Sequence, residues 1–301
     1  MTAPDPSLHP LDAPARDLPG RPMVLPGRGT TFVREQAGPP GAATVLLLHG
    51  LAATGGLNWF ACFAELGRHY RVVAVDHRGH GRGMRTGRRA FRLEDCADDV
   101  AALADVLGID RFVPVGYSMG GPIAQLLWQR HPDRVAGLVL CATARSFGGS
   151  VGGARLVVDT SLATAATAMR YAPPGLRRRV VSAGVDRRLA ARGVTSERTA
   201  AWLTAELSGH DPASVIEATR ALGRFSSASW ISDVSVPTSV VVTTDDNLVH
   251  PLRQRRLAAS IPGARVFPVA GDHSVCATDP SAFVPVLLEA CHWATRAARG
   301  G

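Results

Sequence analysis

Residues 113–121, with the sequence VPVGYSMGG, constrain the fold of this chain more than any other stretch. A short apolar run ends at Gly116, Ser118 follows two residues later, and a run compatible with a helix begins after Gly120. This is a Gly-x-Ser-x-Gly pattern between a strand and a helix, in which the glycines leave room for a tight turn around a strained serine. It predicts a hydroxyl at the carboxyl end of a strand, beside helix N–H groups that favour developing negative charge.

Two later residues carry the groups that a serine nucleophile needs. Asp246 follows the β-branched run 238–244 and His273 follows a second short run, so each is expected on a loop at the end of a strand. A serine hydroxyl needs a base to take its proton, and that histidine needs a carboxylate to fix its tautomer and stabilise its positive charge. We therefore expect Ser118 as nucleophile, His273 as base and then acid, and Asp246 as orienting acid, with the adjacent Asp245 as the alternative carboxylate.

The order serine, acid, histidine resembles that of the α/β-hydrolase family, as do two upstream motifs, LLLHGL at 46–51 and DHRGHG at 76–81. The resemblance covers roughly residues 30–145 and 229–301. It implies an oxyanion hole made by the backbone N–H groups of Leu51 and Met119, and chemistry without a metal or cofactor. It also favours Asp246 over Asp245, because the family places its acid just before an apolar pair near a proline.

Short apolar runs without alternation, such as 42–49 and 135–141, are separated by helical patterns. This rhythm predicts an α/β fold with a mostly parallel β-sheet flanked by helices. Between 146 and 228 no good strand pattern occurs, and helices are expected over 155–171, 174–184, 195–207 and 212–222. We expect a flexible N-terminal tail over 1–26, a core formed by 27–145 and 229–301, and an inserted helical cap over 146–228, where members of the resembled family carry one.

The composition excludes several classes of function. The 301-residue chain has no lysine, which rules out Schiff-base and P-loop chemistry. Its net charge of +8 is carried by arginine, but dense runs such as 177–179 are short and lack interleaved aromatic residues, so nucleic-acid binding is not expected. Asp76, His77 and His80 could mimic a metal cluster, but the intervening glycines favour a turn.

The sequence shows no membrane-spanning segment, secretory signal or cysteine motif. No apolar run is long enough to span a bilayer, and the N-terminus lacks the basic start and apolar centre of a secretory signal. The five cysteines include no Cys-x-x-Cys pair, so neither a disulfide framework nor a zinc site is expected. We therefore expect a cytoplasmic protein; the sequence carries no signal for its oligomeric state.

The predicted function is hydrolysis of a small carboxylic ester with an apolar acyl part. Trp59 and Phe60 either line the acyl side of the pocket or pack in the core of a helix that Asn58 would cap. A thioesterase, a carbon–carbon bond hydrolase or a cofactor-free haloperoxidase would use the same three residues, and a non-catalytic ligand receptor would keep them without turnover. An epoxide-hydrolase mechanism would need an aspartate nucleophile and is rejected, because position 118 is serine.

Overall fold

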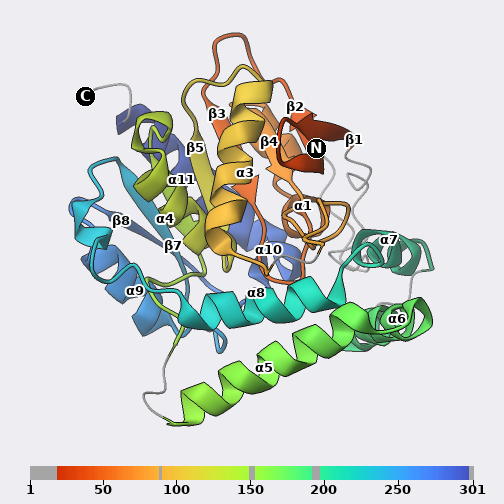
Figure 1. Ribbon diagram of the computed structural model, residues 1–301. Coiled ribbons are helices and arrows are strands. Elements are labelled where there is room, and N and C mark those ends of the chain that lie inside the picture. Colours follow the sequence, from red (N-terminus) through yellow and green to blue (C-terminus); the bar gives the residue numbers. More distant parts are fainter. Residues whose placement is uncertain (1–18, 88–89, 149–152, 192–196, 298–301) are drawn as a thin grey trace.

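The computed structural model describes residues 19–87, 90–148, 153–191 and 197–297 (Figure 1). In these residues one sheet has eight strands in the order β1-β2-β4-β3-β5-β6-β7-β8. Strand β2 pairs antiparallel with both β1 and β4, and all the other neighbours are parallel. The strands are β1 (Gly20–Leu25), β2 (Gly29–Gln36), β3 (Thr44–Leu48), β4 (Arg71–Val75), β5 (Val113–Tyr117), β6 (Leu138–Cys141), β7 (Thr238–Thr243) and β8 (Arg265–Val269).

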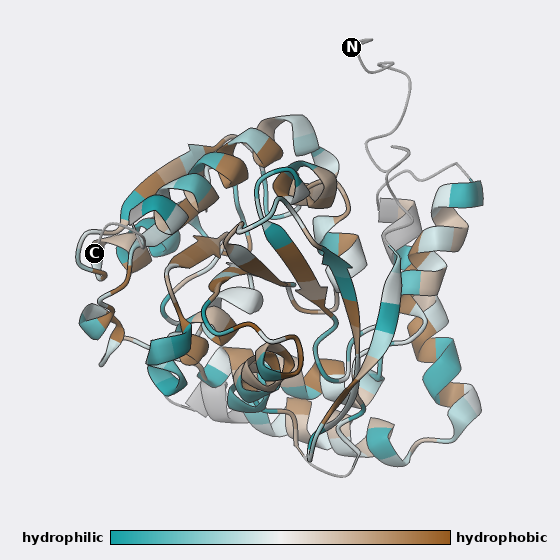
Figure 2. Cartoon of the chain, turned by 90° about the horizontal axis from the view of Figure 1, so that it is seen from above, coloured by the Kyte–Doolittle hydropathy of each residue, from teal (hydrophilic) through white to brown (hydrophobic). Residues whose placement is uncertain are grey.

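The central strands are buried along their whole length, as their continuous apolar sequences predict. Figure 2 shows these strands in brown at the centre of the molecule, with teal residues on the outer sides of the surrounding helices. The parallel strands all end at the same edge of the sheet, where β5 leads directly into Ser118. The predicted α/β fold with a mostly parallel sheet is confirmed.

Helices cover both faces of the sheet, and each face has its own apolar cluster. One cluster is covered by α3 (Leu93–Val106), α4 (Gly120–Arg130) and α9 (Pro251–Ala259). The other is covered by α1 (Gly55–Trp59), α2 (Phe63–Gly67), α10 (Val275–Thr278) and α11 (Pro280–Ala297). Two single turns of 3-10 helix, Pro132–Arg134 and Ile231–Asp233, precede β6 and β7.

A helical region is inserted between β6 and β7, as the sequence predicts. Figure 1 shows it on one side of the sheet, with its first and last helices side by side. The helix predicted over 174–184 continues to Ala191. Gly184 lies inside it, although a glycine in a helix interior costs about 1 kcal/mol of stability relative to alanine. The helices are α5 (Gly153–Tyr171), α6 (Pro174–Ala191), α7 (Glu197–Leu207) and α8 (Pro212–Arg224).

The prediction of a flexible tail over 1–26 is wrong for its last part. Residues 20–25 form strand β1, in register with β2 from Gly20 opposite Arg34 to Leu25 opposite Gly29. Met23 and Leu25 are buried, so this strand closes one edge of the sheet and contributes to the core. Pro22 does not prevent this, because an edge strand tolerates a residue without an N–H. Residues 1–18 of the predicted tail lie outside the described residues.

None of the helices in the described part of the chain combines the length and the apolar character that crossing a membrane requires.

A buried ionic network joins the inserted helices to the sheet. Arg34 on β2 donates to Asp76 at 2.9 Å and to Glu206 on α7 at 2.7 Å, and all three side chains are buried. Glu206 also accepts hydrogen bonds from Arg82 and from the hydroxyl of Thr54. The network therefore connects α7 to β2, to the turn after β4 and to the start of α1.

Replacing Glu206 by glutamine is expected to lower the free energy of unfolding by about 3 kcal/mol, because it leaves the buried Arg34 cation without its second carboxylate. Urea unfolding monitored by circular dichroism measures this loss. The matched control is Glu197→Gln, at an exposed position of the same helix, which should change stability by no more than about 0.5 kcal/mol. Equal effects of the two substitutions would contradict a role for the buried network.

Candidate active site

Ser118 lies in a tight turn that its glycine neighbours make possible. Its φ of +53° is in the left-handed region, which costs a non-glycine residue energy. A Cβ on Gly116 would approach the carbonyl oxygen of Gly120 to 2.2 Å, and a Cβ on Gly120 would approach that of Leu48 to 2.1 Å. Because both contacts are with backbone, no side-chain movement could relieve them, so the Gly-x-Ser-x-Gly spacing is required sterically.

Neighbouring strand ends hold the strained serine in place. The N–H of Ser118 donates to the carbonyl of Cys141 at 2.9 Å, and the hydroxyl of Thr143 donates to the carbonyl of Ser118 at 2.8 Å. A Cβ on Gly121 would meet the side chain of Thr143 at 2.2 Å, so Gly121 leaves the space that Thr143 needs to reach the carbonyl of Ser118. The last residue of β6 and Thr143 just after it therefore fix the backbone on both sides of the serine.

The three predicted triad residues meet at this edge of the sheet. The Nε2 atom of His273 lies 2.9 Å from the Oγ of Ser118, and its Nδ1 atom lies 2.7 Å from Oδ2 of Asp246. The hydroxyl of Tyr117 donates to the carbonyl of His273 at 3.0 Å, which ties the histidine loop to the strand that carries the serine. With Nδ1–H donating to the carboxylate, Nε2 is free to accept the proton of the serine.

Asp246 is held as a buried carboxylate with donors to both of its oxygens. Oδ1 accepts from the N–H groups of Leu248 and Val249, each at 2.8 Å. Oδ2 accepts from the hydroxyl of Thr243 at 2.8 Å and from Nε2 of Gln254 at 3.2 Å, besides His273. Burial opposes ionisation, but the hydrogen bond and charge of His273 and these other donors outweigh it, so the pKa of Asp246 is below its ordinary value.

The adjacent Asp245 occupies a different environment. It is exposed, and its carboxylate accepts from the N–H of Gly271 and the hydroxyl of Thr244. Its contacts brace the loop that carries the histidine, and the carboxylate that contacts the imidazole belongs to Asp246.

The two residues predicted to supply the oxyanion hole are both next to the serine. Leu51 lines the cleft at Ser118, and Met119 is the next residue along the chain. Within the described residues, neither N–H donates a hydrogen bond to another protein group. The preceding N–H, of Gly50, is occupied by Oδ1 of Asn58 at 3.0 Å. In the described part of the chain the N–H groups of Leu51 and Met119 thus have no protein acceptor, as the predicted role requires.

The cleft above Ser118 has a volume of about 280 Å³ and is small and mixed in character. Leu51, Ala52 and the exposed Leu248 form its apolar rim, and Cys276 lies on the histidine side. Trp59 and Phe60, predicted as possible pocket residues, are buried in the core beneath α1 and do not line this cleft. The alternative that they are core residues is the one the structure supports, because Trp59 packs edge-on against Tyr117 of β5 and Phe60 packs edge-on against Trp202 of α7.

Four residues around the triad have positioning contacts that the sequence did not reveal. Asn58 was predicted to cap a helix, but Thr54 caps α1 by accepting from the N–H of Leu57, and Asn58 instead fixes the loop of Gly50. Tyr117, Thr243 and Gln254 hold the histidine and the acid, as described above. The sequence shows that such a side chain can form a hydrogen bond but not with which residue, because the partners here lie anywhere from 3 to 156 residues away.

Histidines fill the space behind the oxyanion loop. His49 donates from Nδ1 to the carbonyl of Gly50 and accepts at Nε2 from the N–H of His77, which requires its neutral form. Burial lowers the pKa of His49 to about 3 and those of His77 and His80 well below their ordinary value. Asp76 accepts from the N–H groups of Gly55 and Arg82, as a turn residue would. Among the residues that the structure describes, no group of three or more histidine, cysteine or acidic side chains is arranged to hold a metal ion.

Comparisons with known proteins identify the family to which this fold belongs. The sequence profile described as alpha/beta hydrolase fold matches residues 43–280. Epoxide hydrolase B of Mycobacterium tuberculosis (strain ATCC 25618 / H37Rv) is 33% identical over 123 residues, covering 38% of this chain and only 33% of that protein. RutD of Caulobacter vibrioides (strain NA1000 / CB15N), provisionally named a carbamate hydrolase, is 29% identical and covers 82% of this chain and 90% of its own length. The enol-lactonase of Burkholderia xenovorans LB400 superimposes with a TM-score of 0.71 at 23% identity, covering 90% of this chain and 100% of that one.

Proposed function

This chain belongs to the alpha/beta hydrolase fold family, and we propose that it is a serine hydrolase that cleaves a carboxylic ester through an acyl-enzyme on Ser118. The observation that carries the proposal is the continuous relay from Ser118 to His273 to Asp246, with contacts of 2.9 and 2.7 Å. In this proposal the acid is Asp246 and the oxyanion donors are Leu51 and Met119.

The reaction follows from that relay. His273 takes the proton of Ser118 as the oxygen attacks the ester carbonyl, and the negative charge on the carbonyl oxygen is stabilised by the two backbone N–H groups. Asp246 stabilises the resulting imidazolium, which then gives its proton to the departing alcohol. In the second half, His273 takes a proton from water, the resulting hydroxide attacks the acyl group, and Ser118 leaves with its proton restored. Each step uses only side chains and backbone groups of this protein, the ester and water.

An ester is the favoured substrate for two reasons. An epoxide hydrolase mechanism requires an aspartate nucleophile, and position 118 is serine, so the similarity to epoxide hydrolase B does not extend to its reaction. The enol-lactonase, whose substrate class is a cyclic ester, shares the fold across nearly the whole chain. A thioester is opened by the same steps, whereas the large aromatic residue usual beside the oxyanion loop of haloperoxidases is replaced here by Leu51.

We further propose that residues 146–228 act as a cap on a core made of 27–145 and 229–301. The loop between α7 and α8 contacts the turn after β4 directly: the N–H of Asp211 donates to the carbonyl of Gly79, and the N–H of Gly81 donates to Nδ1 of His210. Because that turn packs against His49, the inserted helices are positioned next to the oxyanion loop. Apolar walls supplied by such a cap would exclude water from the reacting ester.

A fluorophosphonate probe and a p-nitrophenyl ester test the proposal together. We expect the probe to label Ser118, identified by peptide mass spectrometry, and the ester to release p-nitrophenol in a burst of about one equivalent per enzyme when deacylation is slow. The Ser118→Ala variant should show neither. Turnover that persists in that variant would refute the mechanism, and tight binding of ester analogues by the wild type without turnover would favour a ligand receptor on the same fold.

A further inference from the structure

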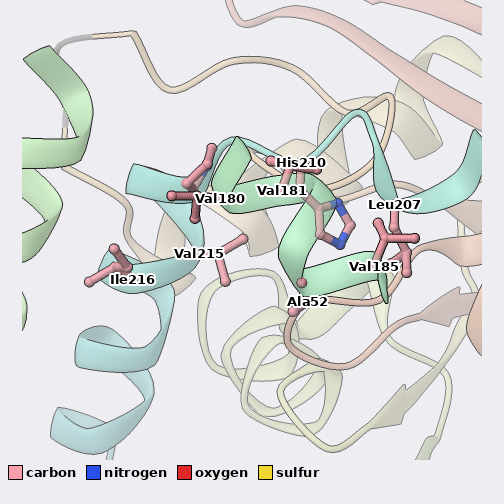
Figure 3. A pocket seen from close by; sticks show the side chains of 10 residues that line it. Ala52, Val180, Val181, Val185, Leu207, His210, Val215 and Ile216 are labelled. Atoms are coloured by element: carbon pink, nitrogen blue, oxygen red, sulfur yellow. The ribbon is translucent and has the colours of Figure 1, made fainter. Parts of the chain in front are cut away.

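An apolar pocket of about 220 Å³ lies among the inserted helices, next to the active-site cleft. Val181 and Val185 of α6 line it on one side, and Val215 and Ile216 of α8 line it on another (Figure 3). Ala52 lines both this pocket and the cleft at Ser118, so the two spaces meet at the oxyanion loop. A substrate whose ester lies at Ser118 can therefore place an apolar segment between α6 and α8.

A second and larger cavity, of about 460 Å³, adjoins the apolar pocket. The two cavities share Val181 and Val185 of α6, together with His210 and Pro212 at the start of α8. Figure 3 shows the imidazole of His210 among the valines of the apolar pocket, and His210 also lines the second cavity, whose other lining residues are mostly polar. The shared residues place the three spaces in a row: the cleft at Ser118, the apolar pocket, and this second cavity, which is called the outer section below.

The outer section is cationic. Arg85, Arg177 and Arg178 line it, and Asp186 is the one acidic residue in its lining among the residues described. Arg177 is already neutralised, because it donates to Asp211 at 2.6 Å. Arg85 and Arg178 form no ion pair or hydrogen bond within the described part of the chain. Two exposed guanidinium groups without an acidic partner thus stand at the far end of the path.

From this arrangement we propose that the substrate is amphipathic: an ester at Ser118, an apolar segment under the cap, and an anionic carboxylate or phosphate held by Arg85 and Arg178. Guanidinium groups bind both kinds of anion with charge-assisted hydrogen bonds, and a low density of competing acidic groups favours an anion over a neutral polar end. The proposal rests on the proposed function, since it names the substrate of the same site. It assigns specificity to residues that lie outside the catalytic relay.

Matched substrates test this inference. The p-nitrophenyl monoester of adipic acid ends in a carboxylate, its methyl ester is neutral at the same end, and a phosphonate-terminated analogue separates phosphate from carboxylate preference. We expect kcat/KM for at least one anionic ester to exceed that of the neutral one by about tenfold at low salt, the effect of two partly exposed charge contacts. The preference should shrink as salt is added, because exposed charges are screened.

Charge-reversal variants then locate the effect. Arg85→Glu and Arg178→Glu should each lower kcat/KM several-fold for the preferred anionic ester and by a much smaller factor for the neutral ester. Arg111→Glu is the matched control, because it changes the net charge equally at an exposed position. Arg111 precedes the amino end of β5, whereas Ser118 follows the carboxyl end of the same strand. Equal rates for anionic and neutral esters, with hydrolysis still dependent on Ser118, would overturn this inference and leave the proposed function intact. Hydrolysis of none of the esters would count against both.

Discussion

An Asp246→Asn variant is expected to fold normally and to lose about ten-thousandfold in kcat for p-nitrophenyl ester hydrolysis. Asn has one acceptor oxygen, which the N–H groups of Leu248 and Val249 would retain. Its NH₂ group would then face Nδ1 of His273, which must turn acceptor and place its proton on Nε2. With Nε2 protonated, the imidazole can no longer take the proton of Ser118.

The control for this prediction is the neighbouring residue. Asp245→Asn removes a carboxylate of the same size one position away, but Asp245 is exposed and contacts Gly271 and Thr244 instead of the imidazole. We expect its kcat to stay within a few-fold of the wild type. Thermal unfolding of both variants checks that each is folded. A large decrease in kcat for Asp245→Asn, together with a small decrease for Asp246→Asn, would show that the catalytic acid is Asp245.

Mild acid is expected to destabilise this protein steeply, beginning near pH 6.5. In the unfolded chain His49, His77 and His80 take up protons around their ordinary pKa of about 6.5, whereas burial lowers their pKa values in the folded state, to about 3 for His49. The unfolded state therefore binds more protons below pH 6.5, and the free energy of unfolding falls as pH falls. Each histidine contributes about 1.4 kcal/mol per pH unit, so the three together approach about 4 kcal/mol per unit.

Urea unfolding at pH 7 and at pH 5 measures this effect. The pH range in which the histidines act differs from that of the carboxylates. The pKa of Asp246 is lowered in the folded state, so its contribution to stability is fully present above the ordinary pKa of aspartate and is lost only in stronger acid. His250→Asn is the control, because His250 is exposed and its removal should leave the pH slope unchanged. A stability that stays constant between pH 7 and pH 5 would contradict the presence of three buried neutral histidines.

The residues around α1 show where prediction from sequence reached its limit. The apolar character of Trp59 and Phe60 is compatible with a pocket wall or with the core, and only the direction in which the short helix faces decides between them. Likewise Thr54 and Asn58 are both good capping residues, and the choice depends on the position of the Gly50 N–H, which comes from a different segment. The strand at Gly20–Leu25 was missed because proline and glycine obscure its pattern, while its pairing with β2 supplies the hydrogen bonds that local sequence could not indicate.

The sequence by itself determined the parallel strands of the sheet, the inserted helices and the turn at Ser118, because buried parallel strands need continuous apolar runs and the turn admits only glycine at its two flanking positions. These are local constraints, and they are written in neighbouring residues. The tertiary structure alone decided which aspartate faces His273, which histidines are buried neutral, and how Arg34, Asp76 and Glu206 share one interior site. Hydrogen bonds and desolvation depend on groups brought together from distant parts of the chain, so their partners become known only when the fold places them in contact.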